Sequence, residues 1–571
     1  MLIMGFNKRT WYIIPISLML FIGVACEAEA PAPAPAPAIP AAAAAPVAAG
    51  QAPVVIIPGA PTAIPARATA TRVLPTPTAT AGEAIKYGGT LKAAHGYSSD
   101  GFDPAYMSSE LGLWVGYPVF HSLLAFDEGA SIIPDLARSW DISGDSKTIT
   151  FHLVKGAKFH DGTPFNAEAV KWNLDRIRDP EVASTRAGDL KSIESVTVVD
   201  DSTVSIKLSE AYRPQVFQLA MQAGLMVSPT AVKKYDGYAN RNSDFAAKPI
   251  GAGSFRLKEY IPGQRTVLVK NDDYWEKGKP YLDKIVFEHI PDSSVRFAMV
   301  RTGEIDIVRE IRADDVPKLE GNSKVKVREQ LSGRTYAFHL SVDRDPWSNQ
   351  ALRAAIAFGI DREAMLKVVH GGAGTVAGSF MSATWAHNPE IRPYYYDVDQ
   401  AKAKLAEAKR TGYDGEPVPF WTESRTISLQ QTESLQAMMR EIGIDMEIRT
   451  VPGGQGWRMT VEREIDFRAT RWTPRVDIDI RIRNLFHSEG GMNFWGYNSP
   501  EVDRLFEEGA SIYDTAKAKV IYDQLQTTLA EDAPFIYLWW GAEYTGVSSR
   551  LRNFTQVPDL QLRVRDIWLD K

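Results

Sequence analysis

The stretch Phe151-His152-Leu153-Val154-Lys155-Gly156-Ala157-Lys158-Phe159-His160-Asp161-Gly162-Thr163-Pro164-Phe165-Asn166-Ala167-Glu168 joins a strand signal to a helix signal through a turn. Alternating apolar residues at 148–153 predict a strand, and Asp161-Gly162 is a typical turn pair. Pro164 and Asn166 are helix-start residues, and the apolar spacing after them predicts a helix over 167–178. A strand and a helix therefore follow each other directly in this region.

The same two kinds of signal alternate irregularly along the rest of the chain. Further strands are predicted at 196–199 and 204–208, with a turn at Asp200-Asp201 between them. Helical spacing predicts helices at 349–360, 399–410, 427–442, 500–510 and 516–531. No short internal repeat is present. The pattern predicts a mixed α/β fold.

The N-terminal part of the chain has a different composition. Lys8 and Arg9 precede an apolar run at 11–25, and Cys26, the only cysteine of the chain, follows that run. This order predicts a signal peptide over 1–25. The segment 26–86 is rich in Ala, Pro and Thr and has no aromatic residue, so it predicts an extended linker rather than a folded unit.

The residues Gly23-Val24-Ala25-Cys26 resemble the cleavage site of a bacterial lipoprotein. The resemblance implies that Cys26 is acylated and holds the protein on the outer face of the cytoplasmic membrane. Each buried CH₂ of an acyl chain contributes about 0.8 kcal/mol, so two or three chains anchor a protein without a spanning helix. Plain cleavage and an uncleaved anchor remain the alternatives.

Several blocks of the large C-terminal part resemble one family. The blocks are Ile133-Pro134-Asp135-Leu136-Ala137-Arg138-Ser139-Trp140, the stretch 151–168, Gly251-Ala252-Gly253-Ser254-Phe255, Asn271-Asp272-Asp273-Tyr274-Trp275, Gly303-Glu304-Ile305-Asp306, Leu352-Arg353-Ala354-Ala355-Ile356-Ala357 and Tyr497-Asn498-Ser499-Pro500-Glu501-Val502-Asp503. Together, in this order, they resemble the extracytoplasmic solute-binding proteins of family 5, which serve ABC importers for peptides and nickel.

The resemblance implies a two-lobed periplasmic-binding-protein fold of type II, of the large cluster C type, with two interlobe crossovers and a closing cleft. It places the first lobe at 87–331 and 540–571 and the second lobe at 332–539. The implied function is a monomeric receptor that binds an oligopeptide or another small polar solute, including an anionic one, and delivers it to an ABC permease and ATPase. The alternatives are a nickel or metal-chelate receptor, and a surface lipoprotein that acts as a chaperone or sensor partner.

The sequence lacks the residue patterns that nucleic-acid binding, metal binding or enzyme catalysis would require. The net charge of −6 argues against general nucleic-acid binding. The histidines have no metal-ligand spacing, no Gly-x-Ser-x-Gly elbow occurs, and a strand pattern rather than a helix follows Gly251-Ala252-Gly253. We therefore expect no enzyme activity, no cofactor and no protein-bound metal.

The segment 468–483 is the richest candidate for solute contact, because it combines Trp472 with many charges. In peptide-binding relatives, the position three residues after this tryptophan is an aspartate that pairs with the peptide's α-ammonium, whereas here it is Arg475. At about 4 Å and an effective dielectric constant near 20, this change replaces about 4 kcal/mol of attraction for an ammonium group by a similar repulsion. Arg475, with Arg471 or Arg425, is thus a candidate for binding a carboxylate. Asp477 in the same segment is a further candidate for solute contact. Internal pairing of Arg475 with Asp477 or Asp479 is the alternative.

The remaining candidates for the cleft wall are Tyr106, Trp421, Trp457, Asn493 and Trp495, each of which also fits a core position. The alternation at 477–483 favours a half-buried strand, whereas relatives often have a helix start there. Both interpretations stay open on the sequence.

Overall fold

The computed structural model describes residues 84–97, 99, 101–382, 384–424, 426–452, 455–472, 476–557 and 561–570. The predicted signal peptide, Cys26 and most of the predicted linker lie outside the described residues, and so do Arg425 and Arg475. Among the described residues, none of the helices has the length and apolar character needed to cross a membrane.

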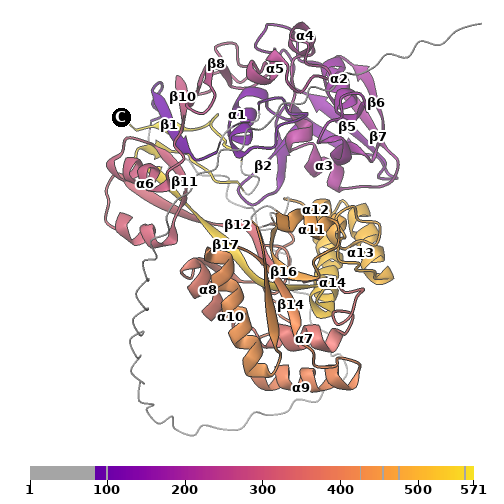
Figure 1. Cartoon of the computed structure of the whole chain (residues 1–571). Coiled ribbons are helices and arrows are strands. Elements are labelled where there is room, and N and C mark those ends of the chain that lie inside the picture. The colour runs from indigo at the N-terminus through magenta and orange to yellow at the C-terminus, as the bar shows by residue number, and fades with distance from the viewer. Residues whose placement is uncertain are drawn as a thin grey trace, which may run out of the picture. The chain divides into compact units, whose positions relative to one another are not determined.

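One 11-stranded sheet connects the two lobes, in the order β15-β14-β16-β12-β17-β11-β1-β10-β9-β8, with β13 beside β17. Its central strands, β12 (Val325–Leu340) and β17 (Phe535–Ser548), pair antiparallel and run from one lobe into the other (Figure 1). They are the two interlobe crossovers. The pairing shifts register between Leu331 and Thr335, and the predicted lobe boundaries at 331/332 and 539/540 lie within these strands.

The first lobe contains one side of this sheet and a separate four-stranded sheet, β4-β5-β7-β6. Its strands are β1 (Thr90–His95), β2 (Leu124–Phe126), β3 (Ile132–Pro134), β4 (Ala137–Ile142), β5 (Thr148–Leu153), β6 (Ile193–Asp200), β7 (Thr203–Leu208), β8 (Phe255–Ile261), β9 (Arg265–Lys270), β10 (Lys284–His289), β11 (Ile307–Ile311), β18 (Leu551–Arg552) and β19 (Trp568–Leu569). Its helices are α1 (Glu110–Phe120), α2 (Ala167–Arg178), α3 (Pro214–Gln218), α4 (Pro229–Lys234), α5 (Asp244–Ala247) and α6 (Ser293–Thr302), with 3-10 turns at Ala187–Leu190, Gln222–Gly224 and Ala313–Leu319.

The second lobe contains the other side of the large sheet and most of the long helices. Its strands are β13 (Gly374–Val376), β14 (Val418–Glu423), β15 (Met446–Val451) and β16 (Phe467–Trp472). Its helices are α7 (Gln350–Phe358), α8 (Arg362–His370), α9 (Val398–Arg410), α10 (Thr426–Ile442), α11 (Gln455–Val461), α12 (Ile478–Phe486), α13 (Pro500–Ser511) and α14 (Thr515–Asp532). Each lobe has its own buried apolar clusters.

The opening stretch folds as its local signals predict. The predicted strand at 148–153 is β5 and the predicted helix at 167–178 is α2. The Asn166 side chain caps α2, because its Oδ1 accepts a hydrogen bond from the Ala169 amide at 3.1 Å. The five later helices are present as α7, α9, α10, α13 and α14.

The strand interpretation of 477–483 is wrong, because this segment is helix α12. Ile478 and Ile482 pack into a second-lobe cluster, whereas Ile480 packs into a first-lobe cluster. Two residues along a helix correspond to a rotation of about 200°, so alternate residues point to nearly opposite sides. The alternation therefore reflects a helix that is buried between the two lobes.

Candidate functional site

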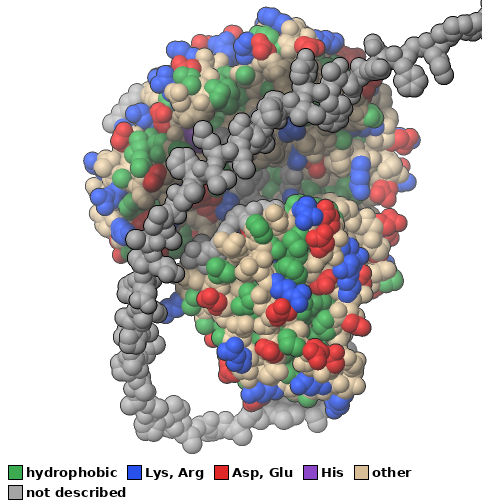
Figure 2. Space-filling model, viewed as in Figure 1, with side chains coloured by type: hydrophobic (Ala, Val, Ile, Leu, Met, Phe, Trp, Pro, Cys, Tyr) green, Lys and Arg blue, Asp and Glu red, His purple; other side chains and the backbone are tan. Residues whose placement is uncertain are grey.

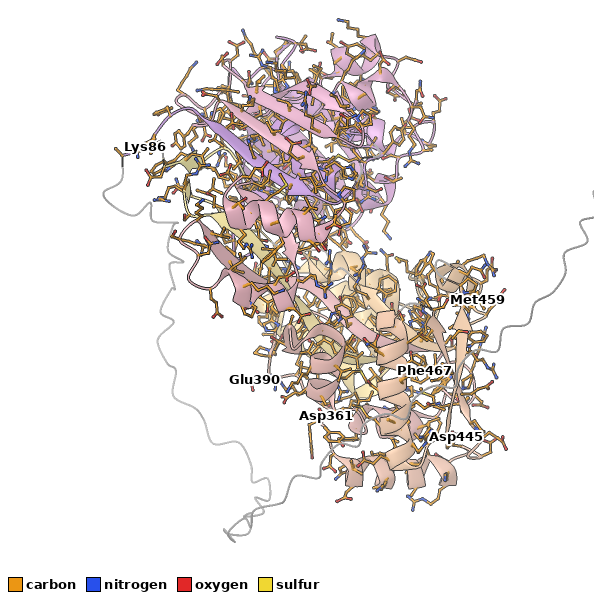
Figure 3. All side chains as sticks on the ribbon, turned by 60° about the vertical axis from the view of Figure 1, so that its left-hand side comes forward. Lys86, Asp361, Glu390, Asp445, Met459 and Phe467 are labelled. Carbon is orange, nitrogen blue, oxygen red and sulfur yellow. The ribbon has the colours of Figure 1, made fainter. Side chains whose placement is uncertain are left out.

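The carboxyl ends of three strands meet at one edge of the second lobe. β14 pairs in parallel with β15 on one side and with β16 on the other. The strand order therefore reverses at β14, and ligands of α/β sheets bind at the carboxyl ends of strands at such points. In Figure 3, Asp445, which precedes β15, lies far from the first lobe, whereas Met459 of α11, the helix after β15, lies near it. The carboxyl ends of these strands thus face the first lobe.

An exposed tryptophan stands at this edge. Trp457 of α11 is 46% exposed, and its ring lies edge-on to Trp472 at 5.9 Å and to Phe494 at 5.7 Å between centroids. Trp472 ends β16 and is buried. The structure therefore brings two predicted site residues, Trp457 and Trp472, into one aromatic cluster that presents a ring to solvent.

Two other predicted residues lie on the neighbouring strands. Trp421 of β14 is half-buried, and the Arg449 guanidinium of β15 lies 5.5 Å from its ring centroid. Arg471 of β16 is exposed next to Trp472. This edge therefore combines apolar rings with a positive charge.

The other wall candidates have partners within the fold. Trp495 is 1% exposed and packs on Phe535 with ring centroids 5.5 Å apart. The Asn493 amide donates to the carbonyl oxygens of His487 and Tyr497 and so fixes its own loop. Tyr106 is buried in the first lobe, where its hydroxyl donates to the Val182 carbonyl at 2.8 Å. The burial of Trp495 and Tyr106 and the backbone hydrogen bonds of Asn493 argue for structural roles.

Asp477 connects the two lobes. It caps α12 through the Asp479 amide, and its Oδ2 accepts a hydrogen bond from Arg213 Nη2 at 2.7 Å. Arg213 precedes α3 of the first lobe, and both side chains are at most 2% exposed. We call this contact the α3–α12 junction (Figure 1).

Aromatic rings surround the Arg213 guanidinium at the α3–α12 junction. Its Cζ lies 4.2 Å from the ring centroid of Trp385, in the second lobe, and 4.9 Å from that of Phe217, in the first. The Arg213 backbone amide also donates to the Ala510 carbonyl at 2.7 Å. The junction therefore combines a buried ion pair, cation–π contacts and a backbone hydrogen bond. No sequence signal indicated Arg213, because its partners are distant in the chain.

Asp479 is the second buried carboxyl at the junction. Its Oδ2 accepts from the Tyr212 hydroxyl at 3.1 Å and its Oδ1 from the Tyr522 hydroxyl at 3.3 Å. Arg483 lies 3.6 Å away, and Asp477 and Arg213 also face it. Burial raises the pKa of the Asp479 carboxyl from 3.8 to about 6, although Arg483 opposes the shift.

This pKa predicts the pH dependence of stability. Between about pH 4 and pH 6 the folded chain binds a proton at Asp479 that the unfolded chain does not, so the group favours folding more as the pH falls. From pH 7 to pH 5 the gain in unfolding free energy is on the order of 1 kcal/mol. We expect Asp479→Asn to lack this gain. Denaturant unfolding of the unaltered protein and of Asp479→Asn at pH 7 and pH 5 measures this gain. An equal pH dependence of the unfolding free energy in the two proteins would contradict the raised pKa of Asp479.

A small cavity lies in the first lobe beside the crossover strands. Its volume is about 30 Å³, and its lining includes Trp114, Arg309, Thr545, Phe554, Gln556 and Leu562. Gln330 of β12 donates from its side-chain amide to the Gln556 carbonyl at 3.3 Å. The cavity is thus connected to the crossover itself.

Two further observations concern the surface charges and the possible metal ligands. Basic and acidic side chains are interspersed on the face that Figure 2 shows, without a continuous basic patch on it. Within the part of the chain that the structure describes, no three His, Cys, Asp or Glu side chains group closely enough to hold a metal ion.

Comparison with known proteins identifies relatives along most of the chain. The glutathione-binding protein GsiB of Pectobacterium atrosepticum is 28% identical over 83% of this chain and 93% of its own length. Heme-binding protein A of Haemophilus influenzae is 28% identical over 77% of this chain and 85% of its own length. Among solved structures, the ABC transporter-associated periplasmic binding protein DppA of Helicobacter pylori, in complex with the peptide STSA, superposes with a TM-score of 0.71 at 26% identity. That superposition covers 85% of this chain and 99% of DppA.

A family model gives the same result. The model of the bacterial extracellular solute-binding proteins, family 5, matches residues 131–494. This range includes the opening stretch, the α3–α12 junction and the strand edge with Trp457. The chain therefore belongs to the bacterial extracellular solute-binding proteins of family 5.

Proposed function

We propose that this protein is the solute receptor of an ABC importer, and that it binds a small acidic, peptide-like solute between its lobes without chemically changing it. The observation that carries the proposal is the convergence of three strand ends, with the exposed Trp457 and Arg471, on the edge that faces the first lobe. An apolar ring desolvates a ligand, and a few fixed polar groups orient it.

The charges at this edge support an acidic solute. Arg471 is exposed at the end of β16, and Arg475 follows it in the sequence where peptide-binding relatives have an aspartate. A guanidinium group binds a carboxylate through two parallel hydrogen bonds. The named ligand of the GsiB relatives, glutathione, is a tripeptide with two carboxylates, so it is the first solute to test.

Titration calorimetry with the full chain in detergent tests the proposal. We expect reduced glutathione or another acidic di- or tripeptide to bind with a Kd in the micromolar range or below, and Trp457→Ala to weaken that binding at least tenfold. Val199→Ala is a matched control, because Val199 is an exposed apolar residue of the first lobe that lies away from the strand edge. Absence of binding across a panel of acidic peptides, sugars and chelates would refute the receptor proposal.

We further propose that Cys26 is acylated and anchors the receptor outside the cytoplasmic membrane, with the linker 27–86 between anchor and lobes. The order of basic residues, apolar run and cysteine supports this. We expect the Cys26→Ser variant to be absent from the membrane fraction of the host. Its intact mass should lack the contribution of the acyl chains. Unchanged membrane association and unchanged intact mass of the mature chain would contradict acylation.

A further inference from the structure

Helix α11, which contains the exposed Trp457, is short. Its seven residues, Gln455–Val461, are too few for a helix to be stable alone in water, so its position depends on contacts with the rest of the lobe. The chain after the helix is anchored, because the Arg463 guanidinium donates to both carboxylate oxygens of Asp343. Arg344 Nη1 also donates to the Arg463 carbonyl at 2.7 Å. A different contact holds the turn that contains Trp457.

That contact comes from Arg468 of β16. Residues alternate between the two faces of a strand, so Arg468 and Trp472 lie on the same face, against which Trp457 of α11 packs. Arg468 Nη1 donates to Thr460 Oγ1 at 3.0 Å, and Thr460 Oγ1 donates in turn to the Gly456 carbonyl at 2.8 Å. Thr460 is fully buried. Two linked hydrogen bonds thus run from the sheet to the N-terminal turn of the helix.

The backbone of α11 also approaches the Arg468 guanidinium closely at Gly456. A Cβ atom at this position would lie 2.7 Å from Arg468 Nη1 and 3.3 Å from Oε1 of Glu423, the last residue of β14. A side chain at position 456 would therefore displace the guanidinium. Burial lowers the pKa of Arg468, and the charge of Glu423 opposes this shift. Gly456, Arg468 and Glu423 thus form one close contact beneath the helix, directly next to Trp457.

We propose that Arg468 is a positioning residue for solute binding, which fixes α11 so that Trp457 presents its ring at the strand edge. It acts through Thr460 and the Gly456 backbone rather than on the solute. Its burial supports this role, since Arg468 is half-buried with a partner in α11 whereas Arg471 of the same strand is exposed. The inference rests on the proposed receptor function and extends it to a residue beneath the binding surface.

Hydrogen exchange of the full chain in detergent, followed by mass spectrometry, tests the position of α11 without any solute. We expect Arg468→Met to speed exchange of the amides at 457–461 about tenfold or more, because the helix loses its contact with the sheet. Thr460→Val should have a smaller effect in the same direction, and it keeps the arginine in place if Arg468→Met folds poorly. Unchanged exchange in both variants would overturn the inference and leave the receptor function intact.

Calorimetry with reduced glutathione and with acidic di- and tripeptides tests the connection to binding. We expect Arg468→Met to weaken binding about threefold to tenfold, and to have no further effect in the Trp457→Ala background. Equal losses in the two backgrounds would overturn the inference, because Arg468 would then act independently of Trp457. If none of these probes binds the unaltered protein, the receptor function and the inference fail together.

Arg353→Met is the matched control. Arg353 of α7 is a buried arginine of the same lobe, and it donates to the carbonyls of Asp532 and Trp347, each at 2.7 Å. Helix α7 lies farther from the first lobe than α11 does (Figure 1). We expect a lower melting temperature with unchanged exchange at 457–461 and unchanged affinity for the probes. Equally fast exchange of α11 in this control would overturn the inference, since general loss of stability would then explain the effect of Arg468→Met.

Discussion

Replacing Asp477 with alanine should lower the free energy of unfolding by about 3–5 kcal/mol, because it leaves the Arg213 guanidinium buried without its counter-ion. Loss of the α12 cap accounts for only about 1 kcal/mol of that change. Chemical denaturation followed by circular dichroism measures the effect. Small-angle X-ray scattering on the same samples shows whether the variant also separates its lobes, since the pair joins α3 to α12.

Asp361→Ala is the matched control for this prediction. Asp361 caps α8 through the Ala364 amide at 2.9 Å, as Asp477 caps α12, but this cap joins two residues of the second lobe. It lies on the part of the second lobe away from the first lobe (Figure 3). We expect a loss of about 1 kcal/mol. Equal losses in the two variants would show that the Arg213 pair contributes nothing.

The double variant Arg213→Met/Asp477→Ala separates two effects. One is the stability that the ion pair contributes, and the other is the cost of leaving the Arg213 charge buried without a partner. Replacing both partners of a buried ion pair by apolar groups is often nearly neutral. We therefore expect the double variant to recover most of the stability that Asp477→Ala loses. A double variant as unstable as the single one would mean that the aromatic contacts of Arg213, rather than its charge, hold the junction.

Trp495→Ala should destabilise the chain by about 3–5 kcal/mol, because Trp495 is buried in the second-lobe core and its removal leaves a cavity. Trp457→Ala removes a side chain that is 46% exposed and should cost about 1 kcal/mol or less. The two tryptophans thus separate a core role from a binding role. A destabilisation of Trp495→Ala below about 1 kcal/mol would contradict the core position.

The sequence predicts the parts of the fold that depend on local signals. Asn166 and the apolar spacing after it are sufficient to locate α2, since a cap and an amphipathic face are properties of neighbouring residues. The sequence pattern predicts a strand where helix α12 lies, and the difference has a physical reason. Its isoleucines face two cores on opposite sides, and that double burial imitates the period of a strand.

The sequence predicts only those residues of the candidate site that lie near one another along the chain. Trp457 and Trp472 meet because parallel strands bring their ends together, and both were candidates from the sequence. Arg213 gave no signal, because its importance depends on Asp477, a partner that lies far away in the chain. Trp495 and Asn493 were candidates by type, but their burial and hydrogen bonds assign them to the framework of the lobe.

Native mass spectrometry of the full chain, purified gently from its host and then denatured to release any bound molecule, tests the receptor proposal most directly. We predict one small molecule per chain, with at least one carboxylate, released on denaturation. A chain that carries no small molecule, and that takes up none from a host extract, would contradict the receptor function. Release of a molecule without an acidic group would contradict the solute class.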